Sequence, residues 1–107
     1  SYAGLKNNKY YNLGKKYFPH GVGSIFTIKL KNGYKACVSM VEKTNLLSHV
    51  ANVGDTRSLI IHPASTTHSQ LSDEEKIKAG AGPDVIRLSI GLEDVNDIIS
   101  DIDNSIK

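Results

Sequence analysis

Apolar and polar residues alternate along two stretches of the chain, as is typical of β-strands with one buried face. Residues 24–30 place three apolar residues on one side and polar residues on the other. Residues 85–90 repeat this pattern, with Arg87 and Ser89 on the side opposite the apolar residues. Both stretches are therefore predicted to be half-buried strands.

Two further stretches, residues 46–53 and 59–61, also have the composition of strands. The pair Gly54 and Asp55 lies between them and indicates a turn, because glycine readily adopts the backbone conformations that turns need. We therefore expect four strands in all.

Three other stretches carry apolar residues every three or four positions, which predicts helices. They are residues 8–17, which end before Pro19, residues 34–44, and a last helix that begins at Asp94. The last helix has one unbroken apolar stripe, formed by Val95, Ile98, Ile99, Ile102 and Ile106. Its other face carries Asp97, Asp101 and Asp103, with the acids weighted toward the helix start, as the helix dipole prefers.

The segment 62–71 has almost no apolar residues and is predicted to be a loop. It leads to Ser72 and Glu75, which have the spacing of a capping box, in which each side chain accepts from the backbone N–H of the other. A short helix is therefore expected to begin there and to stop at Gly80, where a positive φ is easily adopted.

Strands mixed with amphipathic helices predict an α/β fold, more closely an α+β two-layer sandwich. We expect a small mixed sheet with the helices packed on one face, in a single domain that spans residues 1–107. The uncovered face of the sheet, or the loops at its edge, would then meet another domain or subunit.

Charge is distributed unevenly, although the net charge is only +2. Residues 1–41 contain seven lysines and no acid, whereas residues 92–107 contain five acids and one lysine. The lysines are spaced singly and do not interleave with aromatics as in single-strand binders, so we expect a solvated surface and no nucleic-acid partner.

No stretch is long and apolar enough to span a membrane, and residues 1–4 match no signal peptide. The start also lacks a methionine, so we expect a chain cut from a longer one. Cys37, the single cysteine, rules out an internal disulfide and fits a reducing compartment, which favours the cytoplasm.

Arg87 is the most informative candidate for chemistry. A guanidinium within a strand needs a partner, because a buried and unpaired charge costs several kcal/mol. Its planar fork suits a carboxylate bound through two hydrogen bonds. An exposed strand arginine, or one in an internal salt bridge, remains the alternative interpretation.

Other candidates carry a weaker signal. His62 and His68 are five residues apart without a third ligand, which is a poor pattern for a metal site. Ser65, His68 and Asp73 could form a catalytic triad, but no nucleophile elbow surrounds the serine. Cys37 lies on an apolar helix face and is interpreted as a core residue. No metal ligand and no catalytic residue are expected in this chain.

Three stretches, taken in order and spacing, resemble a known family. They read ANVGD at residues 51–55, SLIIHPASTTH at 58–68 and IRLSIGLED at 86–94. Together they are similar to the carboxyl-terminal domain of the Cys/Met-metabolism enzymes, which include cystathionine synthases and lyases, methionine γ-lyase and the O-acetylhomoserine sulfhydrylases. The likeness covers about residues 46–106, and Asn52 together with the residues after Ser65 favours the sulfhydrylase branch.

The resemblance implies a fold-type-I enzyme that uses pyridoxal 5′-phosphate (PLP), with a larger cofactor-binding domain upstream and a homo-oligomeric assembly. It implies that Arg87 binds the substrate α-carboxylate, with Asn52 as a neighbouring contact and Thr67 lining the site. The Schiff-base lysine of the family and the tyrosine that stacks on the cofactor have no counterpart here, so this chain alone is expected to bind no cofactor and to be inactive.

The implied reaction joins O-acetylhomoserine and sulfide to give homocysteine and acetate. A cystathionine γ-synthase or γ-lyase, or a methionine γ-lyase, remains the alternative within the family. A non-catalytic interaction domain remains the alternative outside it.

Overall fold

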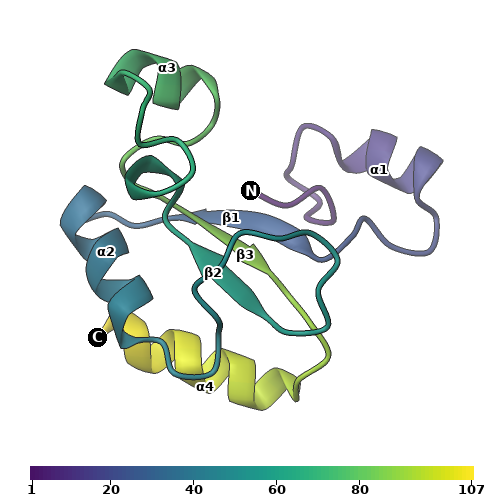
Figure 1. Ribbon diagram of the computed structural model, residues 1–107. Helices are drawn as coiled ribbons and strands as arrows, with labels where there is room; N and C mark the ends of the chain where they lie inside the picture. The colour runs from purple at the N-terminus through teal and green to yellow at the C-terminus, as the bar shows by residue number, and fades with distance from the viewer.

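Three strands form one antiparallel sheet in the order β1-β3-β2, and the computed structural model describes all residues from 1 to 107 (Figure 1). The elements, in chain order, are α1 (Tyr11–Tyr17), β1 (Ile25–Lys29), α2 (Gly33–Lys43), β2 (Leu59–Ile61), the 3-10 helix η1 (Pro63–Ser65), α3 (Asp73–Lys78), β3 (Val85–Ser89) and α4 (Val95–Ile106). The other helices and the strands predicted at these positions are confirmed, with ends that differ by at most three residues, whereas η1 lies in a segment that was predicted to be a loop.

The central strand β3 aligns apolar residues across the whole sheet. Ile86 pairs with Ile28 of β1, and Leu88 pairs with Phe26 of β1 and with Ile60 of β2. Because side chains alternate between the two faces of a strand, these residues share one face. That face is the apolar floor on which the helices pack.

Helices α2 and α4 lie together on this face of the sheet (Figure 1). The buried core that they form with it consists of Cys37, Met40, Val41, Leu47, Ile60, Ile86, Leu88 and Ile98. The two-layer α/β arrangement and the core position of Cys37 are therefore confirmed, whereas α1 and α3 lie away from this layer (Figure 1).

The strand predicted over residues 46–53 is wrong. Only Ser48 pairs with the sheet, through an isolated parallel bridge to Leu59, and all three true strands are antiparallel. The N–H of Val50 bonds back to the carbonyl of Ser48 over 3.0 Å, which turns the chain away from the sheet edge after one residue. The following residues form a loop that returns to β2.

Helix α4 buries less of its apolar stripe than its pattern predicts. Ile98 is buried and Ile102 packs against the core, but Val95, Ile99 and Ile106 are each more than half exposed. The stripe is wider than the surface that α2 and the sheet offer to one side of the helix.

No helix of the chain is both long and apolar enough to cross a membrane.

The face of the sheet opposite the helices is more covered than expected. Leu59, Ile61, Val85 and Ser89 lie on this face and are all buried. The 3-10 helix η1 contacts β3, and Ser1 pairs with Thr27 at the outer edge of β1. The expectation of an open face is therefore wrong for most of the sheet. Arg87 lies on this same face of β3 and is half-buried.

Candidate functional site

Arg87 lies in the middle of β3, where it pairs with Thr27 of β1 and Ile61 of β2. Its Nη2 donates one hydrogen bond, over 3.4 Å, to the backbone carbonyl of Asn52. The four ion pairs of the structure involve other residues, so no carboxylate of this chain neutralises the guanidinium. Since a guanidinium has five N–H donors, most of its capacity remains available to a ligand.

Asn52 meets Arg87 through its main chain rather than its side chain. Its Oδ1 accepts from the N–H of Val53 over 2.8 Å, and its Nδ2 donates to Asp55 over 3.4 Å. The side-chain amide is thus engaged within its own loop. Two residues singled out from the sequence are brought together, and the backbone carbonyl makes the contact.

Thr67 is exposed and makes no hydrogen bond to Arg87 or Asn52. Its Oγ1 lies 2.8 Å from Nδ1 of the adjacent His68, so the hydroxyl is occupied by a neighbour in the same loop. The structure therefore does not join Thr67 to the other two candidates.

His62 is a buried anchor of the loop that follows β2. Its Nε2 lies 3.0 Å from the carbonyl of Pro83, which can only accept, so Nε2 carries the proton. Its Nδ1 then accepts from the hydroxyl of Ser65 over 2.9 Å. The ring of Tyr34 packs edge-on against the imidazole at 4.8 Å, and burial lowers the pKa of His62, so the neutral form is favoured.

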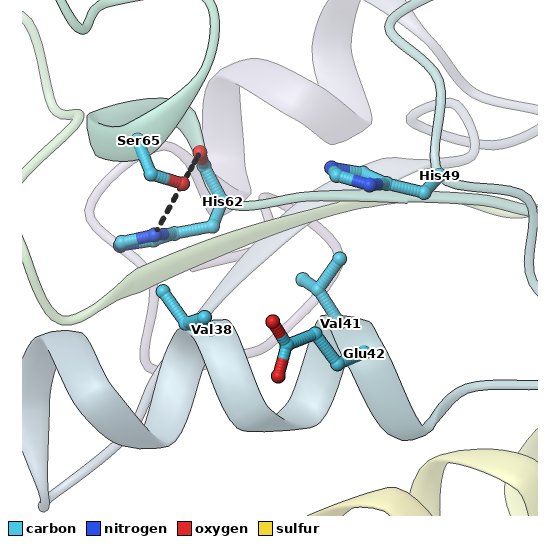
Figure 2. A pocket seen from close by; sticks show the side chains of 6 residues that line it. All are labelled: Val38, Val41, Glu42, His49, His62 and Ser65. Carbon is cyan, nitrogen blue, oxygen red and sulfur yellow. Dashed lines mark hydrogen bonds between the residues drawn. The ribbon is translucent and has the colours of Figure 1, made fainter.

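A pocket of about 220 Å³ lies beside this histidine. Figure 2 shows that α2 supplies Val38, Val41 and Glu42 to it, and that His49, His62 and Ser65 complete its lining. Ser65 bonds to His62 and not to His68, so the possible triad with His68 and Asp73 does not form. No group of three or more His, Cys, Asp or Glu side chains in the chain could hold a metal ion.

This pocket is a separate place from the Arg87 site. Its charged and polar lining residues are Glu42, His49, His62 and Ser65, and neither arginine of the chain reaches it. An acidic side chain at the rim does not favour a carboxylate ligand. The positive charge that such a ligand requires is at Arg87.

The family described as "Cys/Met metabolism PLP-dependent enzyme" matches residues 1–107. This chain belongs to that family.

Named relatives match this chain over almost its whole length. An O-acetyl-L-homoserine sulfhydrylase of Thermus thermophilus is 48% identical over 102 residues, which are 95% of this chain and 24% of that protein. A homocysteine synthase of Schizosaccharomyces pombe is 44% identical over 101 residues, 94% of this chain and 24% of that protein.

A solved structure of a putative O-acetylhomoserine (thiol)-lyase from Campylobacter jejuni, with N'-pyridoxyl-lysine-5'-monophosphate, superposes with a TM-score of 0.90. It is 47% identical to this chain, and the match covers 98% of this chain and 25% of that one. The chain thus spans about a quarter of the length of the relatives that it matches.

The residues of this chain do not by themselves fit a PLP site. All of its lysines are exposed except Lys76, which is half-buried and pairs with Asp73 at 3.6 Å. Lys29 lines a second pocket of about 350 Å³, but this lysine is exposed on a strand edge and pairs with Asp84 at 3.4 Å. No lysine is thus held in an enclosed pocket where it could bond the aldehyde of the cofactor.

Sequence reasoning missed the residues that hold Asn52 in place. Asp55 and Arg57 pair within the loop before β2, and Glu93 binds Ser58 at the far end of that loop. The spacing of an acid and an arginine two residues apart was a signal for the first pair. The pair of Ser58 and Glu93 joins positions 35 residues apart, and no local pattern in the sequence indicates it.

Proposed function

We propose that this chain is the carboxyl-terminal domain, residues 1–107, of a PLP-dependent O-acetylhomoserine sulfhydrylase. In this reaction the bond between the γ-carbon and the acetate oxygen breaks, a carbon–sulfur bond to sulfide forms, and homocysteine and acetate are the products. The domain supplies recognition of the substrate α-carboxylate, through Arg87. The cofactor is held by residues upstream of this chain in the same polypeptide.

The observation that carries the proposal is the state of Arg87. Its guanidinium is oriented by one carbonyl, at 3.4 Å, and neutralised by no acid of the chain. A carboxylate bound through two parallel N–H···O bonds satisfies both the charge and the unused donors. An amino-acid substrate brings such a carboxylate, and its fixed position orients the γ-carbon for attack by sulfide.

Asn52 and Thr67 have smaller roles in this proposal. The carbonyl of Asn52 orients the guanidinium, and Thr67 lines the approach to it from the loop after η1. The full-length enzyme is a cytoplasmic homo-oligomer, a dimer or a tetramer, in which the upstream domain completes the site. The names of the relatives that match this chain support the choice of reaction.

The test uses the full-length polypeptide that contains this chain. Loss of one charge-assisted hydrogen bond is worth about 1.5–3 kcal/mol, so Arg87→Ala should lower kcat/KM roughly tenfold to a hundredfold for each contact removed. Lys29→Ala is the matched control, because it removes a cation from the neighbouring strand and should leave kcat/KM within about twofold. A near-normal kcat/KM in Arg87→Ala would make this arginine structural.

The second substrate distinguishes the sulfhydrylase from other branches of the family. The same enzyme is assayed with O-acetylhomoserine and either sulfide or cysteine. The proposal expects homocysteine from sulfide as the favoured product. Preferred formation of cystathionine from cysteine would instead identify a cystathionine γ-synthase.

A further inference from the structure

The loop between the bridge residue Ser48 and strand β2 is organised by one carboxylate, that of Asp55. Its Oδ1 accepts from the backbone N–H of Arg57 over 3.0 Å and from Nε of the same residue over 3.3 Å. Its Oδ2 accepts from Nη2 of Arg57 over 3.2 Å and from Nδ2 of Asn52 over 3.4 Å. The side chain of Asp55 is only 15% exposed, whereas that of Arg57 is 61% exposed.

The end of this loop that enters β2 is fixed to the continuation of β3. Glu93 accepts from the backbone N–H of Ser58 over 2.7 Å and from its hydroxyl over 2.7 Å. The N–H of Gly91 donates to the same hydroxyl over 2.9 Å. A Cβ at Gly91 would lie 2.2 Å from the carbonyl oxygen of Thr56, so the two segments touch main chain to main chain.

The other end of the loop is also held, because the N–H of Ser48 donates to the carbonyl of Ser58 over 2.9 Å and its carbonyl accepts from the N–H of Ile60 over 3.0 Å. The middle of the loop, at Asn52, has no such backbone anchor. Between the two ends lies Gly54, whose φ of 74° marks a sharp turn, and Val53 is exposed. Apart from contacts to its neighbour Val53 and to Arg87, Asn52 has a single side-chain hydrogen bond, the one to Asp55. Asp55 therefore connects this middle part of the loop to the end that the continuation of β3 holds.

The orientation of Arg87 depends on the position of Asn52, because the carbonyl of Asn52 is the single hydrogen-bond partner of the guanidinium. If Asn52 moves, the guanidinium loses the contact that orients it. The loop is thus bonded to β3 through Asn52 and Arg87, and to the continuation of β3 through Ser58 and Glu93. Asp55 links these two points of attachment within the loop.

We propose that Asp55 is a positioning residue for Arg87: without touching the substrate, it holds the Asn52 carbonyl where the guanidinium is aimed at the substrate carboxylate. This inference rests on the proposed function of Arg87. It adds a role for Asp55 and, through it, for Arg57. Asp55 also keeps its charge over the working pH range, since its bonds to Arg57 lower its pKa to about 2.

The test compares Asp55→Asn with Asp84→Asn in the full-length enzyme. Both variants remove one acid. Asp84 lies directly before β3, away from the loop, and pairs with Lys29 at the end of β1. In Asp55→Asn an N–H₂ group replaces one carboxylate oxygen. The donors of Asn52 or Arg57 that bind this oxygen in the wild-type protein then face another donor and lose their hydrogen bonds. We expect KM for O-acetylhomoserine to rise about threefold to tenfold in Asp55→Asn, with a smaller change in kcat, and no change in Asp84→Asn.

A double-mutant cycle separates positioning from a general loss of structure. If Asp55 acts through Arg87, then Asp55→Asn should raise KM no further in a protein that already carries Arg87→Ala. Additive effects of the two substitutions would overturn the inference. Should Asp55→Asn fail to fold, Arg57→Gln removes the two guanidinium bonds and keeps the others, and the same non-additivity with Arg87→Ala is expected.

The outcomes also distinguish this inference from the function on which it rests. Full activity in Arg87→Ala would refute the proposed function of the domain. Impaired activity in Arg87→Ala together with an unchanged KM in Asp55→Asn would refute only the role of Asp55.

Discussion

Arg87 and Asn52 lie 35 residues apart in the chain and meet through one hydrogen bond of 3.4 Å, from a guanidinium to a backbone carbonyl. A carbonyl orients an arginine without neutralising it. Arg57, the other arginine of the chain, is in the opposite situation, because two N–H groups of its guanidinium, as well as its backbone N–H, are bound to Asp55. Of the two guanidinium groups, only that of Arg87 is both oriented by the fold and free of an acid.

The first prediction concerns the part of the substrate that Arg87 binds. In the full-length enzyme, replacing the α-carboxylate of O-acetylhomoserine by a carboxamide should lower kcat/KM, roughly tenfold or more, since a charge-assisted contact becomes a neutral one. Arg87→Ala should lose most of this preference for the acid over the amide. Measuring kcat/KM for both substrates in both enzymes gives the answer, and an undiminished preference in the variant would assign the carboxylate to another residue.

The second prediction concerns stability in acid. Hydrogen bonds from Arg57 lower the pKa of Asp55 to about 2, and bonds from Ser58 lower the pKa of Glu93. A carboxyl group whose pKa is lower in the folded protein stabilises it above the pKa of the unfolded chain, and this contribution is lost as pH falls through the folded value. The free energy of unfolding should therefore decrease between about pH 5 and pH 2.

Denaturant unfolding followed across this pH range tests the second prediction. Glu93→Gln should show a shallower decrease than the wild-type protein, because one of the groups with a lowered pKa has been removed. An equally steep decrease in this variant would mean that Glu93 does not contribute to the acid sensitivity.

Local hydrogen bonds and local periodicity explain what the sequence could predict. The capping box of Ser72 and Glu75 and the N-cap at Asp94 are both present, because donor and acceptor in each are two or three residues apart. Arg87 could be singled out because it conflicts with the apolar pattern of its own strand. These features need no knowledge of the tertiary fold.

The remaining features depend on contacts between distant segments. Residues 46–53 have the composition of a strand, but only Ser48 pairs with the edge of the sheet, through one isolated bridge. The side chain of Asn52 turns to Asp55, so its backbone reaches Arg87 instead. The pairing of Ser58 with Glu93 requires β2 and β3 to be aligned first, which no local pattern encodes.

The third prediction concerns the reactivity of Cys37. Its thiol is fully buried in the core between α2 and the sheet, and desolvation raises its pKa to about 11. Because the thiolate is the reactive form, the folded protein should react with a thiol reagent at near-neutral pH far more slowly than the denatured protein does. Rapid modification under native conditions would show that the core opens readily or that Cys37 is accessible.

The last prediction concerns Asp101, one of the acids that the sequence pattern assigns to the polar face of α4. Its carboxylate accepts from three consecutive backbone N–H groups, those of Asn45 at 2.9 Å, Leu46 at 3.0 Å and Leu47 at 3.2 Å. These residues follow the end of α2, so one side chain joins the two helices that cover the sheet. Asp101 is thus a tertiary contact, whereas its place in the sequence indicated only a helix face with acids.

Asp101→Ala should therefore lower the free energy of unfolding by about 1–3 kcal/mol, since three donors lose a charged acceptor and one of them is half-buried. Asp97→Ala is the matched control, because it removes an exposed aspartate one turn earlier in α4 and should change stability by no more than about 0.5 kcal/mol. Denaturant unfolding at neutral pH measures both. Equal losses in the two variants would reduce the effect to the helix dipole, and the Asp101 bonds would then contribute nothing to holding α2 against α4.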